Sequence, residues 1–377
     1  MNILQISFHT APMNSLGVND GGGLNVYVES ISRELAKDNI VHIITGEQAK
    51  NISKRNLKLS SFNLFTNQAN TEEKKEFLDE FIEKTFQYIE EHEIDVVHAH
   101  YWLSGLVAKE IKQRYKIPFI FTSHSLGVFI QENGLDRISA EKEIFNSADK
   151  ITASSQFEKE NLLNRYGADK LKIHIVTPGL NEKTFKAFRG EKRKNIILSV
   201  GRIQKQKGQL QTLDLFKNLQ YRIKGLELIF VGGPSGADGE AYLTKMKNKI
   251  EELRIEEDVQ FVGSLSQKKL VKLMRKSKLL IHSAESETFG LVAIEAHRSG
   301  LPVLSTNQGS FKEIISNNED GLVSKSFEDV QVYDFIIKLF ENEEYRSQLI
   351  NNAVKNSLVF NWEITAENLK KAYGSVI

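Results

Sequence analysis

The fold is decided by one stretch of sequence, Asn195-Ile196-Ile197-Leu198-Ser199-Val200-Gly201-Arg202-Ile203-Gln204-Lys205-Gln206-Lys207-Gly208. Its first half is a short apolar run, typical of a buried strand, and its second half is a basic loop bounded by glycines. Open α/β sheets bind their ligands at the carboxyl ends of strands, in the loops that lead into helices. The stretch therefore predicts a parallel strand followed by a ligand-binding turn.

Strand-like runs of the same kind recur along the chain, separated by longer helical patterns. The first series is Ile3–Phe8, Ile40–Ile44, Asp95–His98, Pro118–Thr122, Lys150–Ala153 and Ile173–Val176. The second series is Asn195–Val200, Leu226–Val231, Val259–Val262, Leu279–His282 and Pro302–Ser305. This alternation predicts an α/β fold with two tandem Rossmann-like domains that face each other across a cleft.

The length of the chain also favours two domains, because 377 residues are too many for one ordinary hydrophobic core. The polar, basic stretch from Asn181 to Lys194 is interpreted as the linker. We expect an N-terminal domain over residues 1–185, a C-terminal domain over residues 186–360, and a final helix over residues 361–377 that packs back on the N-terminal domain.

Composition excludes several classes of protein. Fifty Lys and Arg against 49 Asp and Glu leave a net charge of +1, so no overall field attracts nucleic acid. The absence of cysteine excludes disulfides, a thiolate nucleophile and Cys-based metal sites. The N-terminus has the pattern of a strand rather than of a signal peptide, and no apolar run approaches the roughly 20 residues of a membrane span. These features favour a cytoplasmic enzyme.

A glycine-rich turn, Gly21-Gly22-Gly23-Leu24-Asn25, follows the first strand and leads into a helix. Glycines at such a turn let backbone N–H groups approach a phosphate at the positive end of the helix. A tight turn that only packs helix on strand is the alternative. The spacing differs from the GxGxxG of dinucleotide sites, so NAD is not predicted.

Two cations, Arg202 and Lys207, flank the turn after the strand Ile196–Val200. The planar fork of Arg and the mobile charge of Lys together suit a pyrophosphate, and they can offset charge on a leaving diphosphate. A solvated basic loop is the alternative interpretation.

The segment Ser283–Ala296 carries two glutamates around a predicted helix start at Phe289-Gly290. Glu287 precedes that start, and Glu295 lies within an otherwise apolar helix. A carboxylate in apolar surroundings is costly without a partner, so hydroxyl groups of a ligand are plausible partners. The alternative is that Glu295 lies on a solvated helix face.

Three histidines, His98, His100 and His124, lie at or just after strand ends. Neither of their segments has a carboxylate at a recognised zinc spacing, so a metal site is not predicted. A histidine facing the cleft is better placed to bind substrate.

Together these segments resemble the family-four glycosyltransferases of the GT-B fold, and the resemblance covers nearly the whole chain. The segment from Glu287 to Glu295 matches the family's Glu-x7-Glu signature, and Gly201–Gly208 matches its phosphate loop. Within this family, the chain is similar to two subgroups that glycosylate phosphorylated acceptors. Inositol-phosphate N-acetylglucosaminyltransferases share motifs such as Tyr101-Trp102-Leu103-Ser104-Gly105, and sucrose-phosphate synthases share motifs such as Ser123-His124-Ser125-Leu126-Gly127.

The resemblance implies a donor site. Arg202 and Lys207 would hold the diphosphate, Glu287 would bind a hydroxyl of the transferred sugar, and Glu295 would bind the ribose. His124 would contact the donor sugar near the reacting centre. Arg202, Lys207, Glu287 and His124 are thus the predicted catalytic residues. The turn and helix start that would assist in donor binding are formed by Gly22, Gly23, Phe289, Gly290, Leu291 and Val292.

The resemblance also implies an acceptor site formed by Asn25, Tyr101, Ser125 and Arg137. The inositol-phosphate enzymes carry a further lysine before their Tyr-Trp motif, and the segment Asn70–Lys75 has no clear counterpart for it. The acceptor assignment is for this reason less complete than the donor assignment.

The activity implied is transfer of glucose or N-acetylglucosamine from a UDP-sugar to a small phosphorylated polyol or sugar, with retention of configuration. No metal and no cofactor are expected beyond the nucleotide-sugar, and the protein is expected to be a monomer or homodimer. One alternative is a lipid-linked or polysaccharide acceptor at the membrane face, which the cluster Lys50, Lys54, Arg55 and Lys58 could approach. The other is a nucleotide-sugar-binding relative without turnover.

Overall fold

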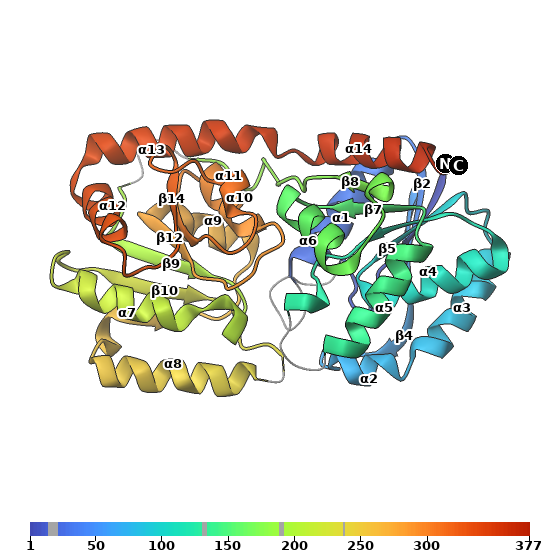
Figure 1. Cartoon of the computed structure of the whole chain (residues 1–377), viewed down its shortest axis with the longest axis horizontal. Helices are drawn as coiled ribbons and strands as arrows, with labels where there is room; N and C mark the ends of the chain where they lie inside the picture. The colour runs from blue at the N-terminus through green and yellow to red at the C-terminus, as the bar shows by residue number, and fades with distance from the viewer. Residues whose placement is uncertain (14–21, 130–133, 188–191, 237) are drawn as a thin grey trace. The chain divides into compact units, whose positions relative to one another are not determined.

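The computed structural model describes residues 1–13, 22–129, 134–187, 192–236 and 238–377. These residues form two compact units. One unit holds the described residues up to Gly179 together with Trp362–Ile377, and the other holds Leu180–Asn361. In both units a parallel sheet is covered by helices (Figure 1), which confirms the predicted α/β class with two Rossmann-like sheets.

The sheet of the first unit has eight described strands. They are β1 (Asn2–Ile6), β2 (Ile40–Glu47), β3 (Ile52–Lys54), β4 (Leu57–Phe65), β5 (Val96–His100), β6 (Phe119–Thr122), β7 (Lys150–Ala153) and β8 (Ile173–Ile175). Their order is β3-β4-β2-β1-β5-β6-β7-β8, and only the edge pair β3 and β4 is antiparallel. The hairpin was not predicted, because β3 is polar and mostly exposed and carries little hydrophobic pattern.

Helices cover both faces of this sheet. They are α1 (Gly23–Leu35), α2 (Thr71–Lys75), α3 (Leu78–Glu90), α4 (Trp102–Tyr115), α5 (Gly134–Ser147), α6 (Gln156–Tyr166) and α14 (Trp362–Gly374), with short 3-10 turns at Gly127–Phe129 and Lys170–Lys172. The apolar faces of α3, α4 and α5 share one core with the sheet, whereas α1 and α14 share a second core on the other face. The last helix therefore completes the first unit.

The sheet of the second unit has six described strands, ordered β11-β10-β9-β12-β13-β14 and all parallel. They are β9 (Ile196–Val200), β10 (Glu227–Val231), β11 (Val259–Phe261), β12 (Leu279–His282), β13 (Val303–Thr306) and β14 (Gly321–Ser324). The helices are α7 (Gln209–Gln220), α8 (Gly239–Leu253), α9 (Gln267–Lys276), α10 (Leu291–Arg298), α11 (Phe311–Ile314), α12 (Val330–Glu341) and α13 (Glu343–Asn356), with 3-10 turns at Lys205–Lys207, Glu256–Asp258 and Ser357–Val359.

The break between the units lies at Gly179, before the boundary expected after residue 185. Leu180 and Phe185 are buried in a core of the second unit, so the chain enters that unit well before β9. Part of the predicted linker, residues 188–191, lies outside the described residues.

None of the helices in the described ranges has the length and apolar character required to span a bilayer. The basic cluster considered for membrane contact belongs to the hairpin region: Lys50, Lys54 and Arg55 are exposed, and Lys58 is half-buried on β4.

Candidate functional site

The basic loop after β9 is held tightly against the end of β12. Gly208 has a φ of 63°, and a Cβ atom there would lie 2.1 Å from the carbonyl oxygen of Ser283, so only glycine fits. The Ser283 hydroxyl donates to the carbonyl oxygen of Lys207 at 2.9 Å. The loop that carries the exposed Arg202 and the half-buried Lys207 is therefore fixed at its end to the neighbouring strand.

Lys207 and Glu287 form an ion pair near the carboxyl ends of the strands β9 and β12. Lys207 Nζ lies 2.7 Å from Glu287 Oε2, and His282 Nε2 lies 3.6 Å from the same oxygen. Burial alone would raise the pKa of Glu287, but the charge of Lys207, assisted by His282 and Arg202, holds this pKa below its ordinary value. Glu287 is therefore a carboxylate at neutral pH. His282 was not among the predicted site residues; burial and Lys207 lower its pKa to about 4, so it is neutral.

The backbone of Glu287 is fixed by the loop after β13. A Cβ atom on Gly309 would lie 2.3 Å from the carbonyl oxygen of Glu287, and the same oxygen accepts from Ser310 N at 3.2 Å. Lys207 and Glu287 were predicted as site residues, and their ion pair is thus supported from two sides, by loops after β12 and β13.

Helix α10 starts at Leu291 with Gly290 as its N-cap, next to the predicted start at Phe289-Gly290. Gly290 has a φ of 88°, and a Cβ atom there would lie 2.8 Å from the Phe311 ring. The ring of Phe289 is buried against Phe360, so only its backbone can face a ligand. Leu291 and Val292 are half-buried in the first turn, where backbone N–H groups point out of the helix.

Glu295 lies one turn further along α10 and is half-buried. Burial among apolar neighbours raises its pKa to about 8. In these surroundings the ionised carboxylate of Glu295 is disfavoured, and hydrogen bonds from hydroxyl groups of a ligand would stabilise it.

In the first unit, His124 follows β6 with a φ of 59°, a left-handed conformation that is uncommon for residues other than glycine. Its Nε2 lies 3.0 Å from Nδ1 of His100, and the Tyr27 ring packs edge-on against it with centroids 5.0 Å apart. Burial lowers the pKa of His124 to about 3, so the imidazole is neutral.

The glycine-rich turn is described only in part, since Gly21 lies outside the described residues. Gly22 caps α1 and Gly23 is its first residue. The Asn25 side chain accepts from Thr10 Oγ1 at 2.9 Å and donates to the carbonyl oxygen of Ala11 at 3.1 Å. Both ends of this amide therefore hold the loop after β1.

Three of the four predicted acceptor residues meet around one guanidinium group. Arg137 donates to the Tyr101 hydroxyl at 3.2 Å, and to the carbonyl oxygen and Oγ of Ser125 at 2.7 and 3.0 Å. The guanidinium also lies 4.8 Å from the centroid of the Tyr101 ring. Tyr101, like His124, has a positive φ, here 74°. The structure thus brings Tyr101, Ser125 and Arg137 together.

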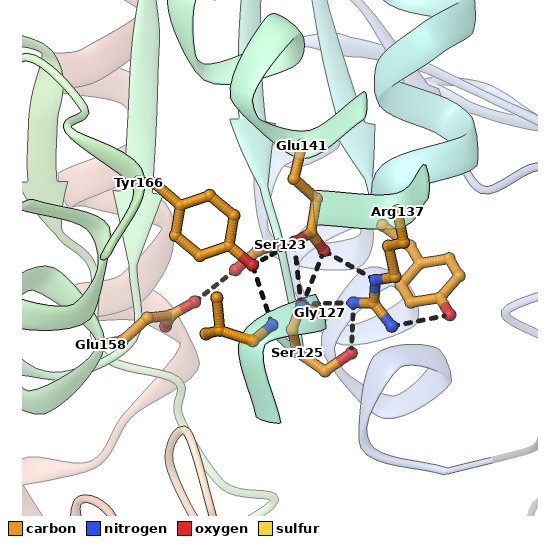
Figure 2. Close-up of polar contacts among 9 residues, drawn as sticks. Ser123, Ser125, Gly127, Arg137, Glu141, Glu158 and Tyr166 are labelled. Atoms are coloured by element: carbon orange, nitrogen blue, oxygen red, sulfur yellow. Dashed lines mark hydrogen bonds and ion pairs between the residues drawn. The ribbon is translucent and has the colours of Figure 1, made fainter. Parts of the chain in front are cut away.

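The arginine is anchored by Glu141, a residue that was not predicted to belong to the site. Figure 2 shows its carboxylate between the Tyr166 hydroxyl and the Arg137 guanidinium. Arg137 Nε donates to Glu141 at 2.7 Å, and Gly127 N donates to the same carboxylate at 2.9 Å. Glu141 lies one helical turn after Arg137 on α5, and this spacing was the available signal in the sequence.

A second buried carboxylate holds the segment that precedes His124. Glu158 accepts from the Ser123 hydroxyl and from Ser154 N, the latter at 2.7 Å (Figure 2 shows Glu158 beside Ser123). Burial raises the pKa of Glu158, and the bonds from Ser123 and Ser154 oppose that rise.

Lys75 lies beside the Tyr-Trp motif. Its Nζ is 5.4 Å from the centroid of the Trp102 ring and 3.0 Å from Glu72 Oε2. Because the segment Asn70–Lys75 could not be matched to a family motif, only the fold reveals that this lysine lies beside Trp102.

No group of three His, Asp or Glu side chains in the described parts of the chain is arranged to hold a metal ion. His98, His100 and His124 instead take part in hydrogen bonds to one another or to neighbouring polar side chains.

The predicted residues thus form two groups. One group lies at the carboxyl ends of strands in the second sheet and consists of Arg202, Lys207, Glu287 and the start of α10, with Glu295 in the next turn of that helix. His124, the acceptor residues and the Gly22-Gly23 turn lie in the first unit.

Comparison with known proteins identifies the family. Residues 21–184 match the family described as Glycosyltransferase Family 4, and residues 181–356 match Glycosyl transferases group 1. A D-inositol 3-phosphate glycosyltransferase from Frankia alni is 30% identical over 97% of this chain and 97% of its own length. Its counterpart from Corynebacterium glutamicum is 28% identical over 100% of this chain and 97% of its own length.

Solved structures agree with this assignment at the level of the fold. A sucrose-phosphate synthase from Thermosynechococcus elongatus superposes with a TM-score of 0.88 at 24% identity, covering 99% of this chain and 98% of that one. HepE from Anabaena, solved in complex with UDP and glucose, superposes with a TM-score of 0.80 at 17% identity over the full length of both chains. The chain therefore belongs to the family-four glycosyltransferases of the GT-B fold.

Proposed function

We propose that the protein transfers glucose or N-acetylglucosamine from a UDP-sugar to a small phosphorylated polyol or sugar, with retention at the anomeric carbon. The observation that carries the acceptor class is the buried Arg137 with its partners Tyr101 and Ser125. The relatives are named D-inositol 3-phosphate glycosyltransferases, and this name supports the same class of phosphorylated acceptor.

The chemistry of this cluster suits a phosphate. The hydroxyls of Tyr101 and Ser125 accept hydrogen bonds from the guanidinium, and each keeps its own hydrogen for a phosphate oxygen. A positive guanidinium behind two hydroxyl donors polarises them toward an anion. We include Lys75 in this proposed site, because its ammonium beside Trp102 would supply a second positive charge.

For the donor, we propose that Arg202 and Lys207 bind the diphosphate together with the first turn of α10. Glu287 would accept from a hydroxyl of the transferred sugar, and Glu295 from the ribose hydroxyls. Charge on the leaving diphosphate would be offset by these two cations, so that no metal ion is required. Activity that persists in excess chelator would support this part of the proposal, and its restoration only by a divalent cation would refute it.

We further propose that donor binding closes the two units, so that Gly22, Gly23 and His124 approach Lys207 and Glu287. Closure excludes water and limits hydrolysis of the donor. Small-angle scattering with and without UDP tests this step, since closure predicts a smaller radius of gyration with UDP. As part of the same proposal, the enzyme acts in the cytoplasm as a monomer or homodimer.

The decisive experiment measures UDP release from UDP-glucose and UDP-N-acetylglucosamine against inositol phosphate, fructose 6-phosphate and glucose 6-phosphate, each with its unphosphorylated counterpart. A phosphorylated acceptor should be used and its counterpart should not. Arg137→Met should raise the KM for that acceptor by about 10-fold or more, as loss of a charge-assisted contact does, with a small effect on donor KM. Equal use of the phosphorylated and unphosphorylated compounds would overturn the acceptor class.

A further inference from the structure

We propose that Tyr373, at the end of the C-terminal helix α14, positions the imidazole of His124 through Gln5 and His100. The proposal deepens the proposed function, because it rests on His124 as the residue that contacts the donor sugar. The tautomer that it assigns to His124 can nevertheless be measured without any activity.

The side chains concerned lie on one face of the first sheet, under α1 and α14. Gln5 on β1 is in register with His98 on β5, and His100 on β5 is in register with Thr122 on β6. Neighbours in register, and residues two apart on one strand, point to the same face of a sheet. Gln5, His98, His100 and Tyr373 are fully buried, so water cannot replace their hydrogen bonds.

Hydrogen bonds connect His124 to the last helix without interruption. His124 Nε2 lies 3.0 Å from His100 Nδ1, and His100 Nε2 lies 2.5 Å from Gln5 Oε1. Gln5 Nε2 donates to the Tyr373 hydroxyl oxygen at 3.3 Å. Four residues from β1, β5, α14 and the loop after β6 therefore form one relay.

The relay continues beyond Tyr373. Its hydroxyl lies 2.7 Å from His98 Nδ1, and His98 Nε2 lies 2.7 Å from Thr122 Oγ1. Thr122 in turn bonds to the Thr152 hydroxyl. Tyr373 thus stands between Gln5 and His98 and serves both.

The donor and acceptor roles follow from the amide of Gln5. Its carbonyl oxygen can only accept, so His100 carries its hydrogen on Nε2. A neutral imidazole has one N–H, which leaves His100 Nδ1 as an acceptor for His124 Nε2–H. Burial holds the pKa of His100 well below its ordinary value and that of His124 at about 3, so both rings are neutral at pH 7. Nδ1 of His124 then carries the lone pair.

Tyr373 keeps the amide in this orientation. Its hydroxyl accepts from the Gln5 NH₂ group while it donates to His98 Nδ1, so it matches only one sense of the amide as long as His98 accepts. Rotation of the amide would reverse every bond as far as His124 and place the hydrogen on its Nδ1. The sense of the relay decides whether His124 meets the sugar as an acceptor or as a donor.

Sequence position alone hides this connection, because Gln5 and Tyr373 are 368 residues apart. Tyr373 and Gln5 are positioning residues, since neither is proposed to touch the substrate. His124 is the group that would receive a hydroxyl hydrogen from the donor sugar at Nδ1.

The test uses the full-length protein labelled with ¹⁵N-histidine, because the nitrogen that carries hydrogen and the nitrogen that carries a lone pair have well-separated shifts. The signals of His124 are assigned by their loss in His124→Asn. We expect hydrogen on Nε2 of His124 in the wild type, and a mixture of both tautomers in Tyr373→Phe. That variant keeps the ring that packs edge-on against His98 and loses only the hydroxyl.

The matched control is Tyr88→Phe. The Tyr88 hydroxyl also bonds to a histidine of the first unit, His42 Nδ1 at 2.8 Å, and it lies outside the relay. The control should leave the His124 signals unchanged. At metal sites, removal of a partner that orients a ligating histidine costs about 10-fold or more in activity; by analogy, kcat of Tyr373→Phe should fall by about 10-fold with little change in donor KM.

Hydrogen on Nδ1 of His124 in the wild type, or wild-type His124 signals in Tyr373→Phe, would overturn the relay. If Tyr373→Phe fails to fold, Gln5→Met tests the same assignment by removing the acceptor of His100 Nε2–H. A tautomer shift in either variant, in a protein that transfers no sugar to any acceptor, would support the relay and refute the proposed function, so the two failures are distinct.

Discussion

Lys207 Nζ lies 2.7 Å from Glu287 Oε2, so the cation proposed for the diphosphate and the carboxylate proposed for the sugar hold each other. The pair keeps Glu287 ionised although burial disfavours its charge. It also places both groups at the point where the loops after β9 and β12 meet. One contact therefore sets both the charge and the position of the donor site.

The pair predicts two effects of Lys207→Met. Loss of the charge that faces the leaving diphosphate should lower kcat/KM by roughly 100-fold or more. Burial of Glu287 would then be opposed only by His282 and Arg202, so the pKa of Glu287 should rise and the acid limb of the pH profile of kcat/KM should move to higher pH. Steady-state kinetics from pH 5 to 8 measures both. The exposed Lys247 on α8 offers the control Lys247→Met, which should change neither.

The close approach of Gly208 to β12 predicts a contrast between two glycines. Gly208 and Gly225 have nearly equal φ angles, 63° and 62°, but an added Cβ meets Ser283 O at 2.1 Å in the first and nothing within 4 Å in the second. Gly225→Ala should cost only backbone strain, about 1 kcal/mol. Gly208→Ala should cost more and should weaken UDP binding, because the loop with Lys207 must move.

Hydrogen exchange in β9 and β12 together with calorimetric titration of UDP measures this contrast. Equal losses of protection and equal UDP affinity in the two variants would show that the contact with Ser283 has no influence on the loop.

The sequence predicted most of the parallel strands, including the edge strands β8 and β11, because they are short apolar runs. It did not predict β3 or β4, since the edge strand β3 is mostly exposed and β4, beside it, alternates buried and partly exposed residues. The strand β14 was also missed, because its four buried residues include only two large apolar side chains, Leu322 and Val323. Pattern alone therefore identifies a strand by its run of apolar side chains, whatever its place in the sheet.

The donor site was predictable for a related reason. Lys207 and Glu287 lie in short motifs directly after strands, so the sequence around each residue indicates its position in the fold. Glu141 and Tyr373 act through partners from other elements, Tyr166 and Gln5 among them, and no local pattern specifies such partners. Residues that position a site through such contacts can therefore be identified only from the structure.

The buried ion pair of Arg137 with Glu141 predicts the effect of Glu141→Gln. The change leaves a buried guanidinium without its counter-charge, which costs about 3 kcal/mol. Both tryptophans, Trp102 and Trp362, belong to the first unit, so their fluorescence in urea follows the unfolding of that unit. We expect a lower urea midpoint and a higher KM for a phosphorylated acceptor.

The control for that prediction lies on the same helix. Glu143 forms a 2.7 Å ion pair with Lys109, but it is 60% exposed. Exposed pairs contribute little, so Glu143→Gln should leave the urea midpoint near that of the wild type. A wild-type midpoint in Glu141→Gln would contradict a structural role for the buried pair.

The raised pKa of Glu295 predicts how the stability of the second unit depends on pH. Its folded pKa is about 8, against an ordinary value near 4.3 in the unfolded chain. Between these values only the folded state holds the proton, so the stabilisation is complete below about pH 4 and is lost as the pH rises through 8.

Glu295→Gln removes this dependence. Relative to the wild type, the variant should gain on the order of 2 kcal/mol at pH 9 compared with pH 5, after allowance for partial exposure. Hydrogen exchange in α10 and β12 measures the difference, with Glu251→Gln on the exposed face of α8 as control. Because ribose hydroxyls would donate to the ionised carboxylate, UDP should also bind the wild type more tightly above pH 8, and the variant should lack this gain. An equal stability difference at both pH values would show that Glu295 is ionised throughout.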